Sequence, residues 1–509
     1  MKHLAGKQVL VLGLGSSGLA LARWCVRCDA HVTVVDTRVA PPQLAALQAS
    51  VPSAKFVHAD MTAALIDGTQ IAMVVKSPGL TPASVAGVTV AAGERGLVVG
   101  NELSLFAQAL ADLKADKAYA PQVIGITGTN GKTTVTSLAG QLVQRAGKSV
   151  AVAGNIGPTL LDTLAEKIDS DCLPEVWVLE LSSFQLDGVK NFEPTVATVL
   201  NITQDHLDWH DTFDAYAAVK NSIYGVDGVM VLNRNDPVVR AAHIVKTALV
   251  SPVKGKVPRN IITYGHDVPK RPGDYGIELV NGMAWLVRAS ELDETIKRKR
   301  GDKSGAGDQA ELLIQRLMPV DALRIHGLHN ATNALAALAL THAAGCALSP
   351  MLHGLREYRG EPHRVESVAV VQGVEYFDDS KGTNVGATVA ALVGLGDQRK
   401  LVVILGGVGK DQDFTPLAAP VARYGRAVVL IGRDAPLIKA ALAGGAVALL
   451  DASSMQEAVS LAADQAQAGD AVLMSPACAS FDMFENYEHR AREFCQAVQA
   501  LAIEQGAVL

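Results

Sequence analysis

The chain has 509 residues, of which 49% are hydrophobic and 19% are charged. This length indicates three domains more readily than one, and this composition excludes a disordered chain. The formal net charge of −6 gives no electrostatic reason to bind nucleic acid or an anionic membrane.

Six cysteines do not form the dense pattern of a disulfide framework. Cys25 and Cys28 make a C-x-x-C pair, but no second pair completes a zinc site, so we interpret them as ordinary thiols of a helix. No signal peptide opens the chain, and no apolar run is long enough to span a bilayer. We therefore expect a cytoplasmic protein.

Residues 1–115 alternate short apolar strands with helices. Strands are expected at 9–12, at 31–36 and from residue 73 to the turn at 77–79, and the glycine-rich turn 13–18 leads into a helix rich in Ala and Leu. This alternation predicts βαβ units on a parallel sheet, that is, a Rossmann-like N-terminal domain.

The polar stretch 111–117, followed by Pro121, predicts a linker to a second domain at 116–358. Its strands are expected to begin at 123–124 and to continue at 149–153, 176–180 and 196–200, with a helix at 331–340. The segment 291–308 is charged and has no periodicity, which predicts a solvated loop. Its basic run 297–300 has acidic neighbours and no interleaved aromatic residues, so we interpret it as solvated rather than as a nucleic-acid patch.

The alternation restarts near residue 358 and predicts a third α/β domain at 359–509. Strands are expected at 374–377, 401–405, 428–431 and 471–474, and a helix at 485–502 closes the chain. The predicted fold class is therefore α/β with three domains: Rossmann-like at the N-terminus, a P-loop ATPase in the centre and Rossmann-like at the C-terminus.

The segment 125–134, Gly-Ile-Thr-Gly-Thr-Asn-Gly-Lys-Thr-Thr, follows an apolar strand and opens a helix. The N–H groups of such a turn can surround a triphosphate, and the helix places its positive end there. Lys132 can reach the β- and γ-phosphates, and the Thr133 hydroxyl can hold Mg²⁺. The strict spacing G-x-x-x-x-G-K-[ST] is not met, because Ile126 stands five positions before Gly131.

Two further polar groups follow strands of this domain. Glu180 ends the strand at 176–180, where an acid completes the Mg²⁺ shell of P-loop proteins. The segment 205–211 concentrates metal-capable groups, and His206 and His210 are spaced to share one helix face. It is not H-E-x-x-H, which disfavours a zinc hydrolase. His206 follows the carboxyl end of a strand, where α/β sites form, whereas His210 fits a site residue and a satisfied polar group equally well.

The turn at 13–18, with Asp36 at the end of the next strand, matches the dinucleotide fingerprint. The glycines recognise a pyrophosphate, so the match fits NAD and also another diphosphate that bears a ribose, such as UDP. Ser16 and Ser17 could donate to either.

The third domain places polar segments beyond its strand ends at 378–384, 406–410 and 475–480, and carries Pro-His-Arg at 362–364. Their lysines and arginine favour recognition of phosphates and carboxylates.

Taken together, these segments resemble the Mur ligases, the ATP-dependent amide-bond ligases of cytoplasmic peptidoglycan precursor synthesis. The resemblance covers nearly the whole chain and rests on the segments 36–38, 77–79, 128–133, 154–157, 180–185, 201–206, 379–384 and 475–481. It is closest to the member that adds D-glutamate to UDP-N-acetylmuramoyl-L-alanine through an acyl phosphate. It implies ATP, two Mg²⁺ ions, those two small-molecule substrates and a monomer, with no nucleic-acid or membrane partner.

The resemblance also implies roles for individual residues. Lys132, Glu180, His206 and Lys220 would be catalytic. Thr133 and Glu180 would hold one Mg²⁺, and His206 and a carbamylated Lys220 the second. ATP would contact Gly128, Thr129, Asn130, Gly131, Lys132, Thr133, Thr134, Asn330 and Arg364, with Asp379 near its ribose. The UDP substrate would contact Ser16, Ser17, Asp36, Thr37, Ser77, Gly79, Asn155 and His206. Glutamate would contact Lys381, Thr383, Lys410, Ser480 and Phe484, with Tyr487 beside them in a position where the family pattern has Phe.

Three other functions share part of this pattern. A folylpolyglutamate synthetase would share the P-loop but not a UDP-binding first domain. A nicotinamide dehydrogenase would explain residues 13–18 but not the P-loop. A P-loop switch protein would need no amino-acid pocket, so ATP hydrolysis that depends on both acceptors would separate a ligase from it.

Overall fold

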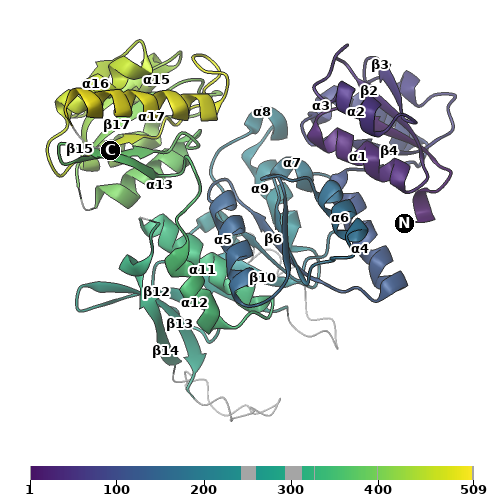
Figure 1. The fold of residues 1–509 in the computed structure, drawn as a ribbon, viewed down its shortest axis with the longest axis horizontal. Coiled ribbons are helices and arrows are strands. Elements are labelled where there is room, and N and C mark those ends of the chain that lie inside the picture. Colours follow the sequence, from purple (N-terminus) through teal and green to yellow (C-terminus); the bar gives the residue numbers. More distant parts are fainter. Residues whose placement is uncertain (1, 242–258, 293–311, 326, 398, 507–509) are drawn as a thin grey trace.

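The computed structural model describes residues 2–241, 259–292, 312–325, 327–397 and 399–506. The basic run 297–300 and most of the loop at 291–308 lie outside these residues. In Figure 1 the N-terminal domain (purple) and the C-terminal domain (yellow and light green) stand on either side of the central domain (blue to green).

The N-terminal domain is built on a five-stranded parallel sheet in the order β3-β2-β1-β4-β5. Its strands are β1 (Gln8–Leu12), β2 (His31–Asp36), β3 (Lys55–His58), β4 (Ile71–Lys76) and β5 (Val98–Gly100), with helices α1 (Ser16–Arg27), α2 (Leu44–Ser50) and α3 (Pro82–Glu94). The apolar residues of β1 are buried on both faces, as a parallel strand covered by helices requires. The predicted Rossmann-like sheet is confirmed here.

Helix α4 (Glu102–Lys117) corrects the prediction of a linker at 111–117. Asn101 caps the helix in a capping box with Ser104, and Leu113 is buried in its last turns, so the polar stretch is the exposed end of a helix. The Phe106 ring packs edge-on against Trp177 of the central sheet, with centroids 5.1 Å apart. Helix α4 therefore lies against the central sheet.

The central domain has a six-stranded parallel sheet in the order β11-β10-β9-β6-β8-β7. The strands are β6 (Gln122–Thr127), β7 (Val150–Gly154), β8 (Val176–Glu180), β9 (Val196–Val199), β10 (Val229–Asn233) and β11 (Ile261–Tyr264). The helices are α5 (Lys132–Arg145), α6 (Leu160–Asp169), α7 (Ser183–Leu186), α8 (Leu207–His210), α9 (Phe213–Asn221), α11 (Leu328–Ala343) and α12 (Leu348–Glu357). Helix α11 is buried over most of its length and packs on α5 and on β9 to β11.

A small antiparallel sheet extends this domain at the lower left of Figure 1, with strands β12 (Tyr275–Val280), β13 (Met283–Glu291) and β14 (Leu312–Pro319). The sequence patterns did not predict it. Short 3₁₀ turns are η1 (Lys2–Leu4), η2 (Ala63–Leu65), η3 (Ser222–Tyr224), η4 (Val320–Ala322) and η5 (Thr415–Leu417).

The C-terminal domain has a six-stranded sheet in the order β15-β16-β20-β17-β18-β19, parallel except for the β15–β16 hairpin. Its strands are β15 (Glu366–Val371), β16 (Val374–Asp378), β17 (Leu401–Gly406), β18 (Gly425–Ile431), β19 (Ala448–Asp451) and β20 (Ala471–Met474). Its helices are α13 (Val385–Gly396), α14 (Ala418–Tyr424), α15 (Ala435–Leu442), α16 (Met455–Gln465) and α17 (Tyr487–Glu504).

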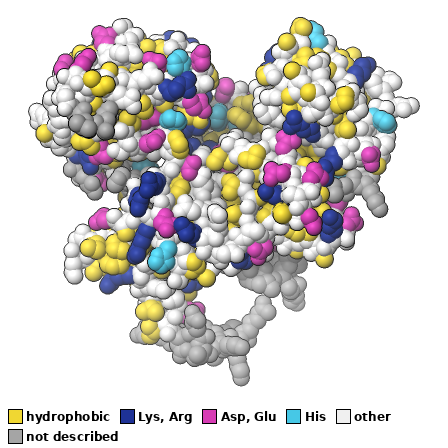
Figure 2. Space-filling model, viewed as in Figure 1, with side chains coloured by type: hydrophobic (Ala, Val, Ile, Leu, Met, Phe, Trp, Pro, Cys, Tyr) yellow, Lys and Arg dark blue, Asp and Glu magenta, His cyan; other side chains and the backbone are white. Residues whose placement is uncertain are grey.

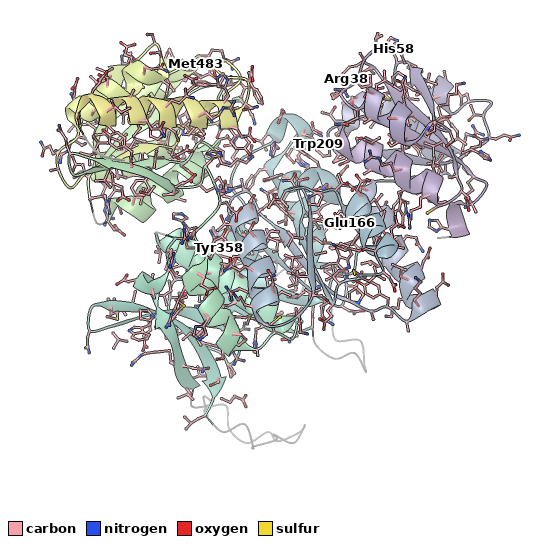
Figure 3. The ribbon with its side chains drawn as sticks, viewed as in Figure 1. Arg38, His58, Glu166, Trp209, Tyr358 and Met483 are labelled. Atoms are coloured by element: carbon pink, nitrogen blue, oxygen red, sulfur yellow. The ribbon has the colours of Figure 1, made fainter. Side chains whose placement is uncertain are left out.

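The N-terminal domain is joined to the central domain by polar side chains as well as by α4. Lys76 at the end of β4 donates to Asp187 at 2.7 Å, and its Nζ lies 5.5 Å from the centre of the Trp209 ring on α8. Figure 3 shows Trp209 at the junction between the N-terminal and central domains, and Figure 2 shows a hollow between the two upper lobes.

Candidate active site

The glycine-rich turn lies between β6 and α5, at the carboxyl end of the central sheet. Gly131 has φ +81°, and a Cβ added there would lie 2.9 Å from Oδ1 of Asn333, so only glycine fits. Asn201, just after β9, holds the backbone of the turn at Asn130. Its Oδ1 accepts from the Asn130 N–H at 2.8 Å, and its Nδ2 donates to the Asn130 carbonyl at 3.0 Å. The predicted strand, turn and helix are confirmed.

Lys132 is the first residue of α5 and turns its side chain back over the loop. Its Nζ donates to the carbonyls of Gly128 (2.9 Å) and Thr129 (2.8 Å). Burial lowers the pKa of Lys132, and the negative charge of Glu180 partly offsets this decrease. An ammonium held at this position is ready to interact with phosphate oxygens at the loop.

A cavity of about 520 Å³ opens in front of the loop, between the central and C-terminal domains. The central domain lines it with Thr129, Asn130, Gly131, Lys132, Thr133, Asn155, Ile156, Glu180, Asp205 and His206. The segment after α12 and the C-terminal domain line it with Glu361, Pro362, His363, Arg364, Lys381, Thr383, Asn384, Lys410, Tyr487 and Glu488. Most residues predicted to contact ATP phosphates, Mg²⁺ and glutamate therefore face one cavity.

Two of the residues predicted to hold Mg²⁺, Thr133 and Glu180, bring oxygen donors to this cavity. Glu180 is buried, and its Oε1 accepts from Nδ2 of Asn155 at 2.7 Å. Its Oε2 is buried and has no hydrogen-bond partner among the described residues. A buried carboxylate oxygen without a hydrogen-bond partner is a suitable ligand for a hard cation. Thr133, which carries a hydroxyl, lines the same cavity. These two residues fit Mg²⁺.

Lys220 lies behind the loop and is only 2% exposed. Its Nζ donates to the Gly128 carbonyl at 2.9 Å and to Oγ1 of Thr127 at 3.5 Å, and lies 4.7 Å from the centre of the Tyr216 ring. Burial, together with the charge of Lys132, holds the pKa of Lys220 well below its ordinary value. An ammonium has no lone pair for a metal, so Lys220 fits a metal site only after covalent modification.

The two histidines do not share a helix face as predicted, because α8 begins at Leu207 and His206 precedes it with φ +54°. His206 lines the cavity, and burial lowers its pKa. His210 is buried instead, with its Nε2 2.9 Å from Oγ of Ser183, and burial lowers its pKa to about 4. His210 therefore has the structural role that the sequence left open.

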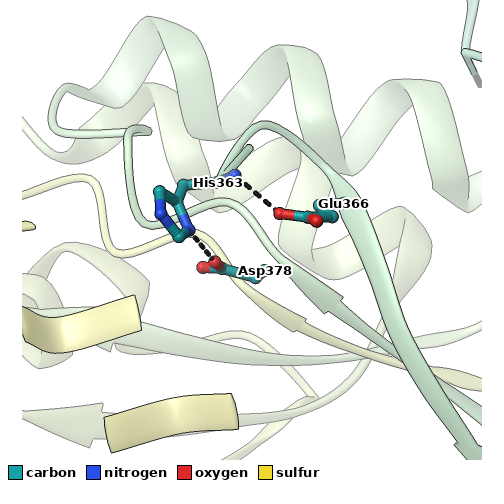
Figure 4. A group of neighbouring side chains, drawn as sticks. All are labelled: His363, Glu366 and Asp378. Atoms are coloured by element: carbon teal, nitrogen blue, oxygen red, sulfur yellow. Dashed lines mark hydrogen bonds and ion pairs between the residues drawn. The ribbon is translucent and has the colours of Figure 1, made fainter. Parts of the chain in front are cut away.

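His363 and Arg364 connect the central domain to the third sheet. Nδ1 of His363 lies 2.7 Å from Oδ2 of the buried Asp378, and its N–H donates to Oε2 of Glu366 at 2.9 Å (Figure 4). These contacts fix the segment that carries Arg364, whose Nη2 donates to Oγ1 of Thr133 at 2.7 Å across the domain interface.

A smaller cavity of about 110 Å³ continues from the loop toward α11. Asn330, Arg364 and Asp379, the residues predicted at the nucleotide end, line it together with Thr134. Asp379 accepts from Oγ of Ser475 at 2.6 Å, and burial raises its pKa to about 7. The geometry thus brings all the predicted ATP residues except Gly128 to the lining of two adjoining cavities.

The predicted glutamate residues divide into two groups. Lys381, Thr383 and Lys410 line the large cavity, whereas Ser480 and Phe484 do not. The Phe484 ring packs edge-on against His489, with centroids 5.7 Å apart. Tyr487 does line the cavity, and Nζ of Lys381 lies 3.6 Å from the centre of its ring. This contact lies in the distance range of a cation–π interaction.

Arg490 on α17 is a supporting residue that the sequence reasoning missed. It is fully buried, and its guanidinium donates to the carbonyls of Ser380 (2.9 Å) and Cys478 (3.1 Å). It thereby ties together two polar segments that follow β16 and β20. An arginine on a helix gives no sequence signal for this role.

The predicted UDP residues follow adjacent strands of the first sheet. Asp36 is buried and accepts from the Leu14 N–H at 2.8 Å and from Nη2 of Arg38 at 2.8 Å, which holds its pKa at about 2. Oγ of Ser77 donates to the Gly13 carbonyl at 3.1 Å. Ser16, Thr37 and Gly79 are exposed, Ser17 is half-buried, and Asn155 lies across in the central domain.

The fold and the cavity together define a P-loop enzyme whose nucleotide loop faces a cationic pocket of another domain. Three family models match the chain: a Mur ligase MurD-like N-terminal domain over residues 7–99, a Mur ligase middle domain over 126–341, and a Mur ligase glutamate ligase domain over 363–478.

Among curated proteins, the UDP-N-acetylmuramoylalanine--D-glutamate ligase of Albidiferax ferrireducens is 62% identical over all of this chain and 99% of its own length. The Ralstonia nicotianae protein of the same name is 55% identical over 99% of each chain. The chain belongs to the Mur ligase family.

Solved structures show the same fold at low identity. MurF ligase from Thermotoga maritima, determined in complex with ADP, aligns over 98% of this chain and 97% of its own, with 16% identity and a TM-score of 0.57. The UDP-N-acetylmuramate-alanine ligase of the same organism aligns over 97% and 99%, with 18% identity and a TM-score of 0.51. Among the described helices, none has the length and apolar character needed to cross a membrane.

Proposed function

We propose that this chain is an ATP-dependent ligase that joins D-glutamate to UDP-N-acetylmuramoyl-L-alanine during peptidoglycan precursor synthesis. The observation that carries the proposal is a single cavity in which the P-loop faces Lys381, Thr383 and Lys410 of another domain. The full-length relatives named for this reaction support the choice of substrates. Such precursors are made in the cytoplasm, and one chain carries every proposed site residue, so a monomer suffices.

The first step brings two anions together. The substrate carboxylate attacks the γ-phosphorus of ATP, the bond to the bridging oxygen of ADP breaks, and an acyl phosphate forms. Lys132 and Arg364 line the cavity at the loop and offset this repulsion. Mg²⁺, held by Thr133 and Glu180 with the second ion at His206 and carbamylated Lys220, would supply further charge neutralisation.

In the second step the neutral glutamate amine attacks the acyl carbon to form a tetrahedral intermediate. The bond from the acyl carbon to the phosphate oxygen then breaks, and inorganic phosphate leaves with the proton that the nitrogen loses. Lys381, Thr383 and Lys410 would orient the amino acid so that its nitrogen approaches the acyl carbon. The N-terminal domain would hold UDP through Ser16, Ser17, Asp36, Thr37, Ser77 and Gly79, with Asn155 nearer the reacting end. Ser480 and Phe484 remain predicted glutamate residues.

The test of this function is ADP release and product formation with UDP-N-acetylmuramoyl-L-alanine and a panel of D- and L-amino acids. We expect ADP release only when both the UDP substrate and D-glutamate are present. Equal release with L-glutamate, or release without an amino acid, would contradict the proposal.

Replacing Lys410 with alanine should raise the KM for glutamate more than the KM for ATP. Lys410 faces the cavity, and a charge-assisted hydrogen bond from its ammonium to a carboxylate is worth about 1.5–3 kcal/mol, roughly a 10- to 150-fold change. Initial-rate kinetics would measure this effect. Lys439→Ala, on α15 of the same domain and outside the cavity lining, is the matched control. An unchanged glutamate KM would remove Lys410 from the pocket.

A further inference from the structure

The nucleotide loop and the C-terminal domain meet through a reciprocal pair of side-chain amides. Nδ2 of Asn130 donates to Oδ1 of Asn384 at 3.2 Å, and Nδ2 of Asn384 donates to Oδ1 of Asn130 at 3.1 Å. Nδ2 of Asn384 also lies 3.5 Å from Oδ2 of Asp205. Asn384 is only 5% exposed, so water competes little for these bonds.

Each amide is fixed on its own side of the interface. The backbone of Asn130 is held by Asn201, as described above. Asn384 is the N-cap of α13, and its Oδ1 also accepts from the Ala387 N–H at 2.9 Å. Two rigid groups that meet in this way define one relative position of the two domains.

Gly386, in the first turn of α13, lets the two surfaces approach this closely. A Cβ added there would lie 2.7 Å from Oγ1 of Thr203 and 3.2 Å from Nδ2 of Asn130. A side chain at this position would require a shift of Thr203 or of the start of α13.

The amide pair adjoins the reacting groups. Asn384 directly follows Thr383, and both line the large cavity with Lys381. The position of the proposed glutamate residues relative to the P-loop therefore depends on where α13 meets Asn130. The connection between the domains passes through Gly360, whose φ of +92° favours glycine.

We propose that Asn130 and Asn384 form a latch that aligns the glutamate-binding segment of the C-terminal domain on the nucleotide loop in the closed enzyme. Both are positioning residues in this role, and the inference rests on the function proposed above. The latch sets the approach of the amine to the acyl carbon, a step in which a misplacement of about 1 Å can cost 10²-fold in rate.

Asn384→Ser separates the pairing of Asn384 with Asn130 from its role as the N-cap of α13. Serine is as good an N-cap as asparagine, so α13 keeps its cap, but its side chain is too short to pair with Asn130. We expect kcat to fall by about tenfold or more, as for the loss of two hydrogen bonds, while nucleotide affinity measured without the other substrates changes less than about threefold. Because the proposed pocket residues come from two domains, we expect the wild type to become more compact when an ATP analogue and the UDP substrate bind. Small-angle scattering should show a smaller decrease in the radius of gyration for Asn384→Ser.

Gly386→Ala tests the close approach independently. Alanine favours the helix, so the melting temperature should stay the same or rise, yet the added methyl group should lower kcat and compaction as Asn384→Ser does. Gly93→Ala is the matched control, because Gly93 is also helical and an added Cβ meets nothing within 4 Å. Wild-type kcat in both Asn384→Ser and Gly386→Ala would overturn the latch.

A double-mutant cycle tests whether the two amides act on each other. Asn130 is also a predicted ATP contact, so each variant is measured at a saturating concentration of the ATP analogue. Under that condition Asn130→Ala, Asn384→Ser and the double variant should show strongly non-additive losses of compaction, because either single change already breaks the pair. Additive losses, or a loss of kcat with normal compaction, would overturn the proposal. Scattering with the ATP analogue and the UDP substrate needs neither glutamate nor turnover, so the latch and the proposed ligase reaction can fail separately.

Discussion

Replacing Lys132 with methionine should lower kcat by roughly 10³-fold or more, in line with other charge-stabilising groups in phosphoryl transfer. Methionine keeps the length and much of the packing of the side chain but removes its charge. The phosphoryl group would then pass to the carboxylate without the ammonium that the loop carbonyls of Gly128 and Thr129 hold in place. Single-turnover ADP formation would measure the chemical step directly.

The control for this experiment is Lys117→Met, an exposed lysine at the end of α4. It should retain wild-type kcat. The Lys132→Met protein should keep a cooperative melting transition, because it removes a buried charge rather than a packed apolar group. A loss of less than tenfold in the chemical step would contradict a charge-stabilising role for Lys132.

Local patterns predicted the parts of the site that are built from consecutive residues. The segment from β6 to α5 is a strand, a glycine-rich turn and the start of a helix, in consecutive residues. The shape of the turn depends on the glycines within it. Glu180 was singled out for the same reason, because it ends a buried strand, and the structure places it in the lining of the cavity. The parallel sheets were also predictable, since their strands are short apolar runs separated by helices.

Contacts between distant segments could not be predicted in this way. The bond from Arg364 to Thr133 joins residues 231 positions apart, and the Asn130–Asn384 pair joins residues 254 apart. The end of α4 was predicted as a linker for a different reason. Its last turns bury little besides Leu113, so residues 111–117 have the polar composition of a linker, although the capping box at Asn101 and Ser104 starts a helix that continues through them.

Replacing Lys220 with arginine should make the enzyme nearly inactive, with a loss of roughly 10³-fold or more in kcat, while leaving it folded. The side chain is buried behind the P-loop, next to the Gly128 carbonyl. Arginine keeps the positive charge but stays protonated, so it cannot become an anionic oxygen donor. The proposed second Mg²⁺ would then lose a ligand and meet a cation instead.

The physical reason for expecting a carbamate lies in the environment of the amine. Burial and the nearby charge of Lys132 lower the pKa of Lys220, so a larger share of the side chain is the neutral amine near pH 7 than for an exposed lysine. The neutral amine has the lone pair that attacks CO₂. The reaction forms an N–C bond and converts the neutral amine into an anionic carbamate, whose oxygens suit Mg²⁺, with release of one proton.

A ¹³CO₂ NMR experiment would detect this group directly, because a labile carbamate can be lost in intact-mass spectrometry. We expect a carbamate signal in the wild type and none in Lys220→Arg. Depletion of CO₂ should lower the wild-type activity, and added bicarbonate should restore it. Lys190→Arg, a change at an exposed lysine of the central domain, is the control and should leave both the signal and the activity unchanged. Full activity of Lys220→Arg would show that the buried amine has only a structural role, in which its bond to the Gly128 carbonyl supports the loop.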